Sequence, residues 1–221
     1  MARPSTPKLS RAAIATAALA LVDRSGEFTM PALATALGVS PSSLYNHVGS
    51  KADIVELMRG EAMSAVRLPA RPDPLPDRLP DGGSPPAAGD QDWMAVLRGI
   101  AIGYLDSYAR HPRLIPLLTA YTVRDATTLR VYDAMARAFA AGGYGPAATL
   151  RAVTILDSFI LGSALDAAAP TVVWEADEAA SREFTEALAA GLGEPQRARR
   201  AFLEGLDLIL GGFAARAGES F

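Results

Sequence analysis

The stretch TMPALATALGVSPSSLYNHVGSK, residues 29 to 51, decides the fold because it holds start and stop signals for two short helices. Thr29 can cap a first helix, with Pro31 in its first turn, where a missing backbone N–H costs nothing. Gly38 supplies the backbone freedom that a sharp turn needs. Ser40, again followed by proline, repeats the cap signal. The stretch therefore predicts a helix-turn-helix.

The second helix of this pair would present a polar face from an apolar scaffold. Leu44 and Val48 point inward, and the residues on or beside the outward face are Ser42, Ser43, Tyr45, Asn46 and His47. A short polar helix face suits the major groove of DNA, where base edges offer donors and acceptors. The pattern indicates a DNA-reading unit.

The segment LGVSPSSLYNHVGSK places Leu-Tyr-x-His-Val ahead of a capping Ser50 and Lys51. It resembles the N-terminal domain of the TetR family of transcriptional regulators, and its tetracycline-repressor branch most closely. The motif resemblance covers roughly residues 10 to 66. Beyond it, only size and helical pattern agree with the family. The resemblance implies a fourth helix that joins the DNA-binding domain to a larger helical body.

The resemblance also implies a set of contacts to double-stranded operator DNA. Ser42, Ser43 and Asn46 would face base edges, Tyr45 and His47 would lie near phosphates, and Lys51 and Thr29 would each meet a phosphate at a helix start. Pro31 stands where that branch often has a base-reading arginine, and proline cannot donate a hydrogen bond, so a different operator is expected. The alternative is that these are ordinary polar surface residues.

Composition favours an all-α chain. Half of the 221 residues are hydrophobic and 7% are aromatic, with alanine and leucine prominent and little strand-like alternation. The absence of cysteine excludes disulfides and cysteine-ligated metal sites. The net charge of −3 divides into +3 over residues 1–51 and −6 over the rest. This division suits a DNA-contacting module on an acidic body, although an ordinary solvated surface also explains it.

Four segments are predicted along the chain. They are a DNA-binding domain over 1–50, a connecting helix over 51–68, a proline-rich linker over 69–89 and an effector-binding and dimerisation domain over 90–221. The expected helices cover residues 10–24, 30–36, 41–47, 51–67, 92–110, 113–118, 123–141, 147–168, 177–190 and 195–216. Ser50 with Asp53 forms a variant capping box. Apolar residues surround the 147–168 helix on nearly every side, so we expect it to be buried all round.

The apolar run from Ala12 to Val22 follows basic residues and resembles a secretory signal. We reject that interpretation because Ile14, Ala18 and Val22 share the helical face that must cover the other two helices of a DNA-binding domain. No other apolar stretch is expected to reach the roughly 20 residues that span a bilayer. A cytoplasmic protein without a membrane partner is expected.

The body should bind a small-molecule effector, because the resemblance places an effector pocket among its central helices. The candidate lining residues are Trp93, Leu97, Tyr104, Tyr108, His111, Tyr121, Tyr132, Phe139 and Phe159. Plain core packing is the alternative for each of them. Family members that bind metal–tetracycline use a histidine late in the fourth helix, and Met58 to Arg67 contains none. A larger hydrophobic or aromatic compound is therefore preferred.

The resemblance also implies a homodimer, formed by the last two long helices. The candidate interface residues are Gly162, Ser163, Gly205, Leu206, Ile209 and Phe213, with packing inside one chain as the alternative. No catalytic residue, metal ligand or cofactor is expected. The sequence has only two histidines, and it contains no nucleophile elbow, phosphate-binding loop or HExxH pattern. A constitutive DNA-binding protein without an effector remains a third class, distinguished by ligand-independent binding to DNA.

Overall fold

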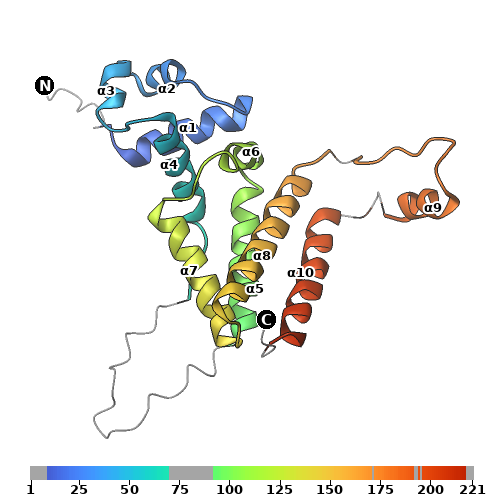
Figure 1. The fold of residues 1–221 in the computed structure, drawn as a ribbon. Coiled ribbons are helices and arrows are strands. Elements are labelled where there is room, and N and C mark those ends of the chain that lie inside the picture. The colour runs from blue at the N-terminus through green and yellow to red at the C-terminus, as the bar shows by residue number, and fades with distance from the viewer. Residues whose placement is uncertain (1–8, 70–91, 171, 192–193, 195, 218–221) are drawn as a thin grey trace, which may run out of the picture.

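A computed structural model describes residues 9–69, 92–170, 172–191, 194 and 196–217, and every regular element in them is a helix (Figure 1). This confirms the all-α prediction. The elements are α1 (Arg11–Ser25), α2 (Met30–Leu37), α3 (Pro41–Tyr45), α4 (Lys51–Met63), α5 (Trp93–Tyr108), a 3₁₀ turn (Pro112–Leu114), α6 (Ile115–Leu118), α7 (Ala126–Ala141), α8 (Pro146–Ala167), α9 (Arg182–Gly191) and α10 (Arg197–Ala215). The linker expected over 69–89 lies, apart from Pro69, outside the described residues.

Helices α1, α2 and α3 form a small head against α4 (Figure 1). Each begins at a hydroxyl cap, because Ser10, Thr29 and Ser40 accept hydrogen bonds from the backbone N–H three residues later at 3.1, 3.2 and 3.1 Å. Gly38 ends α2 with φ 66°, in the left-handed region that glycine enters without strain. The helix-turn-helix geometry thus follows from the cap and turn signals of the sequence.

Helix α4 runs from the head into the body, with α1 on one side and α5, α6 and α7 on the other (Figure 1). Ser50 Oγ accepts from the Asp53 backbone N–H at 3.2 Å, and Asp53 Oδ2 accepts from the Gly49 N–H at 2.9 Å. This reciprocal pair is the expected capping box. The helix ends at Met63 rather than near residue 67, because the chain tightens there into i→i+3 bonds that carry Val66 into the core.

Three other helix bounds differ from expectation, and a side-chain cap accounts for two of them, the starts of α7 and α9. Helix α7 begins after Asp125, whose carboxylate accepts from the Thr128 N–H at 2.8 Å and so caps the helix. Helix α9 begins only after Ser181, whose hydroxyl accepts from the Phe184 N–H at 3.2 Å. Helix α3 stops at Tyr45, two residues early. In α7 and α9 the helix therefore begins at a residue whose side chain caps it, and not at the first residue of the helical pattern in the sequence.

Helix α8 corrects two expectations. It is not buried all round in the single chain, because Leu150 and Ile155 are 70% and 51% exposed. It is also long and apolar enough to cross a bilayer by length and composition, with 22 residues and a mean hydropathy of 1.4, contrary to the expectation that no such stretch exists. One such helix is weak grounds for a membrane span, since a bundle helix passes the same test. Its exposed apolar face instead marks a surface that another element can cover.

Candidate nucleic-acid interface and effector core

The residues expected to contact DNA lie on one side of the turn-rich head. Ser42, Asn46 and His47 are exposed, Tyr45 is 51% exposed, and Ser43 is partly buried. Because α3 ends at Tyr45, the amide and imidazole side chains project from the turn after the helix rather than from its last turn. Beneath them Leu44 and Val48 are buried, as the sequence predicts. A rigid apolar base therefore supports an exposed polar surface.

Local contacts restrict the side chains of this surface. The Ser42 and Ser40 hydroxyls lie 2.9 Å apart, which holds Ser42 near the start of α3. The Lys51 ammonium lies 5.0 Å from the centroid of the Phe28 ring, a cation–π contact at the start of α4. Thr29 Oγ accepts from the Ala32 N–H at 3.2 Å, and this leaves its own proton free to donate. The head thus presents hydroxyl, amide and ammonium donors, which phosphates and base edges accept.

The effector candidates separate into groups rather than lining one pocket. In the middle of the body, the Tyr104 and Tyr132 hydroxyls both donate to Asp157 Oδ1 at 2.9 Å. Tyr108 packs against Tyr104 with ring centroids 4.9 Å apart, and its hydroxyl has no partner among the described residues. Burial is the largest influence on the pKa of Asp157 and raises it, while the two tyrosine hydrogen bonds lower it. These four residues are the Asp157 cluster.

Four more candidates lie away from this cluster. Trp93 and Phe139 have ring centroids 6.2 Å apart, and Leu97 is buried in the core. Phe159 instead stacks on Phe202 of α10, with centroids 5.4 Å apart and planes 11° apart. The aromatic residues therefore fill the core of the bundle in separate places, as the core-packing alternative anticipates for part of the set.

Two candidates lie at the joint between head and body. His111 Nδ1 is 2.9 Å from Oδ2 of Asp23 on α1, so this histidine ties the head to the body. The Tyr121 carbonyl accepts from Arg59 Nη2 at 3.1 Å. A cleft of about 390 Å³ opens beside His111, between α1, α4 and α5. These residues are placed to transmit movement between the two parts.

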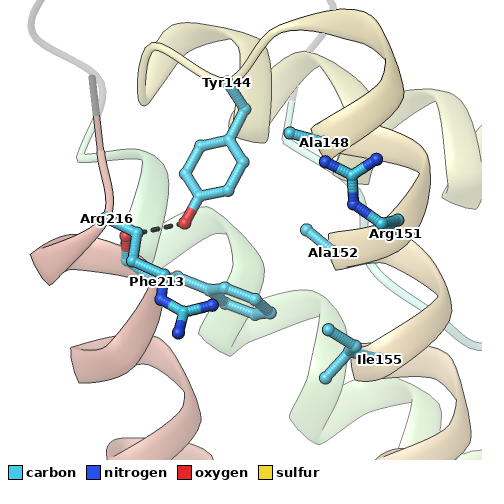
Figure 2. A pocket seen from close by; sticks show the side chains of 7 residues that line it. All are labelled: Tyr144, Ala148, Arg151, Ala152, Ile155, Phe213 and Arg216. Atoms are coloured by element: carbon cyan, nitrogen blue, oxygen red, sulfur yellow. Dashed lines mark hydrogen bonds between the residues drawn. The ribbon is translucent and has the colours of Figure 1, made fainter. Parts of the chain in front are cut away.

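A cavity of about 100 Å³ lies between α8, α10 and the turn before α8, and Figure 2 draws the side chains that line it. The residues around it are Tyr144, Ala148, Arg151, Ala152, Ile155, Phe213 and Arg216. The Tyr144 hydroxyl donates to the Phe213 carbonyl at 2.7 Å and closes one side. Effector pockets usually measure about 300 to 1,000 Å³, so this cavity is too small to hold a large effector.

The buried pair of Glu56 and Arg59 on α4 is a feature that the sequence analysis missed. Arg59 Nε donates to Glu56 Oε1 at 2.8 Å, and its Nη2 donates to the carbonyls of Leu118 and Tyr121 at 3.1 Å each. Glu56 Oε2 in turn accepts from two backbone N–H groups just before α7, including that of Asp125 at 2.8 Å. The pair therefore fastens α4 to the end of α6 and the start of α7. Opposite charges three residues apart inside an apolar helix were the available signal.

The dimer candidates also divide by burial. Leu206 and Phe213 are buried inside the single chain, and a Cβ on Gly205 would lie 2.8 Å from the Phe159 ring. These three positions pack within the chain, and their place in a dimer interface stays a prediction. Gly162 has nothing within 4 Å of a Cβ position and is exposed, while Ser163 and Ile209 are partly buried. The surface left open on α8 and α10 is thus narrower than the predicted set.

Comparisons with known proteins identify the family. Residues 85–217 match the family model described as the tetracyclin repressor-like C-terminal domain. An HTH-type transcriptional regulator of Saccharopolyspora erythraea is 29% identical over 217 residues, which are 96% of this chain and 78% of the relative. The chain therefore belongs to the TetR family of transcriptional regulators, which are not enzymes.

Solved structures share the fold. ActR of Streptomyces coelicolor in complex with actinorhodin superposes with a TM-score of 0.71 at 18% identity, covering 96% of this chain and 99% of that one. BioQ with its double-stranded DNA operator gives a TM-score of 0.62 at 19% identity, covering 94% and 99%. At these identities the likeness concerns the fold, and it extends over both the head and the body.

Proposed function

We propose that the protein is a repressor that binds a near-palindromic operator as a homodimer and is released by a small hydrophobic or aromatic effector held in the body. The observation that supports this proposal is how the head is connected to the body. The exposed polar surface of the head is joined to the body through helix α4, which Glu56 and Arg59 fasten to the end of α6 and the start of α7, and through the contact of Asp23 with His111. A change in the body near α6 or α7 therefore moves the head, and an effector can act at a distance from DNA.

The operator contacts follow from the exposed set. Asn46 reads a base edge with its amide, Ser42 and Ser43 assist it, and Tyr45, His47, Lys51 and Thr29 position the head on phosphates. The likeness to BioQ, which was solved on its operator, supports this use of the fold. The protein acts in the cytoplasm, where it reaches the chromosome.

The homodimer is proposed from the uncovered face of α8 and α10. Ile155, Gly162 and Leu165 recur at intervals of seven and three on α8, and Leu208, which is 79% exposed, lies on α10. A groove of about 310 Å³ runs between the two helices beside Gly162. A second copy covers this face in a four-helix arrangement, because stripes of this spacing pack helix against helix. Two-fold symmetry then sets two half-sites in successive major grooves.

The likeness to ActR, which was solved with actinorhodin, supports an effector in the body. The effector favours one arrangement of α5, α7 and α8 over another, and its differential affinity sets the size of the effect, typically about 1 to 3 kcal/mol.

Selection of genomic fragments by the purified protein tests the proposal. The recovered sequences are expected to share an inverted repeat, and a fluorescent copy of it should bind with an affinity that falls as salt rises. Compounds made or exported by products of the neighbouring genes are then added to the complex. At least one is expected to weaken binding. If compounds that bind the body leave operator affinity unchanged, the repressor is constitutive and the effector part of the proposal fails.

A further inference from the structure

Asp157 is a carboxylate in the middle of the body that forms no ion pair with a described basic side chain, although the guanidinium of Arg59 is near enough to lower its pKa. Its Oδ1 accepts from the Tyr104 and Tyr132 hydroxyls at 2.9 Å each. Its Oδ2 accepts no hydrogen bond from a described residue, and no described basic side chain forms an ion pair with it. Two neutral donors compensate a charge in a low-dielectric core only in part, because a counter-ion contributes more than a hydroxyl dipole.

The other charged groups nearby cancel one another. Glu56 and Arg59 are the buried charged residues of the described core, and they pair at 2.8 Å. The guanidinium of Arg59 is further used by two backbone carbonyls. The partly buried Asp125 adds a second carboxylate on the α7 side. The charge of Arg59 lowers the pKa of Asp157, but it is shared with Glu56, so the centre of the body keeps a negative charge at Asp157 that is compensated only in part.

Aromatic rings and an unused hydroxyl adjoin this charge. Tyr108 is fully buried, and its hydroxyl has no partner among the described residues. Such a group costs about 1 to 3 kcal/mol unless a ligand atom satisfies it. The faces of Tyr104 and Tyr108 lie together, with centroids 4.9 Å apart, and aromatic faces attract cations. Tyr132 and Asp157 are partly exposed, so the cluster is reached from the surface between α7 and α8.

We propose that the Asp157 cluster recognises a hydrophobic effector carrying one positive charge, such as a protonated aromatic amine. The ammonium donates to Asp157 Oδ2, and a polar atom of the ligand accepts from Tyr108. The cavities described above lie elsewhere, so binding opens the packing at the partly exposed Tyr132. The inference rests on the proposed function and specifies its effector by charge. A neutral compound of the same shape gains only apolar burial, and an anion is repelled.

Isothermal titration of the full chain, without DNA, tests this with three probes of one shape. They are 1-naphthylmethylamine, which is protonated at pH 7, the neutral 1-naphthalenemethanol and the anionic 1-naphthoic acid. The amine is expected to bind about tenfold more tightly than the alcohol, the size of a desolvated cation contact. Asp157→Asn removes the charge at constant shape and should reduce amine binding to that of the alcohol. Asp133→Asn on the exposed side of α7 is the matched control and should keep the preference.

Equal binding of amine and alcohol, no binding of any probe, or a preference that survives Asp157→Asn overturns the proposal. If Asp157→Asn fails to fold, the pH dependence of the unchanged protein decides instead. The amine stays protonated as the pH falls, so its advantage over the alcohol should disappear as Asp157 is protonated, and a constant advantage refutes the cation site. Because no operator is present, these results are independent of the release experiment. An operator released only by neutral compounds would leave the proposed function intact and remove this inference.

Discussion

Replacing Glu56 with glutamine tests whether charge holds α4 to the body. Both carboxylate oxygens accept hydrogen bonds, one from Arg59 Nε and the other from the N–H groups before α7. A glutamine offers one acceptor oxygen and one NH₂ group. Whichever way the amide turns, a donor faces a donor on one side, so at least one of these contacts is lost.

The magnitude follows from burial. The side chains of Glu56 and Arg59 are 10% and 6% exposed, so solvent does not replace the missing charge. Removing one member of a buried ion pair costs about 3 to 5 kcal/mol, because the other charge stays buried and unpaired. Arg59 keeps its two carbonyl acceptors, which places the expected loss near the lower limit, at about 3 kcal/mol. That is a large share of the total stability of a domain.

Urea unfolding of Glu56→Gln at one protomer concentration measures this loss, since the proposed dimer would make stability depend on concentration. Circular dichroism follows the whole chain, and the fluorescence of Trp93 and Trp174 follows the body. Glu61→Gln is the matched control, because Glu61 is exposed on the same helix and should change stability by less than about 0.5 kcal/mol. A loss below about 1 kcal/mol, equal to that of the control, would refute the fastening role of the pair.

Four further outcomes are expected. Lys51→Ala should weaken binding to every DNA sequence and lower the slope of log affinity against log salt by about 0.9, measured by fluorescence anisotropy. Asn46→Ala should reduce the free energy of binding by about 1 to 3 kcal/mol on the operator alone. Leu208→Asp should yield monomers in light scattering, whereas Leu129→Asp, on an exposed face of α7, should leave the dimer intact. Gly205→Ala should cost about 1 to 3 kcal/mol in urea unfolding, because its Cβ would meet an aromatic ring at 2.8 Å.

Local signals in the sequence located the head and most helix starts. Thr29, Ser40 and Ser50 all cap the helices that they were expected to cap, because a hydroxyl and a backbone N–H three residues later are neighbours in any fold. The end of α4 was missed. Whether residues after Met63 continue the helix depends on where Val66 can be buried, which is decided by packing against the body.

The centre of the body could be predicted only in part. Tyr104 and Tyr132 were selected as aromatic residues, yet their partner Asp157 is 53 and 25 residues away along the chain. Helical periodicity places a residue on a face but does not say which faces meet. An acidic residue near the middle of a helix whose other charged residues are Arg151 and Asp166 was the available signal for Asp157. The same limit applies to the glycines. Both Gly162 and Gly205 would allow another helix to approach closely, but the space beside Gly162 is open, whereas the Phe159 ring occupies the space beside Gly205.

The contacts that hold the start and the middle of α4 explain how a ligand bound in the body would change the affinity of the head for DNA. Ser50 and Asp53 fix its start to the head, and Glu56 and Arg59 fix it to α6 and α7. Lys51 and Arg59 are eight residues apart, or about 12 Å along a rigid helix. A displacement at the body anchor would therefore reach Lys51, the residue proposed to contact a phosphate, without loss in a flexible joint. The size of the proposed response is then limited by the effector. Its preference for one body arrangement is the free energy available to separate the two heads of the proposed dimer from their half-sites.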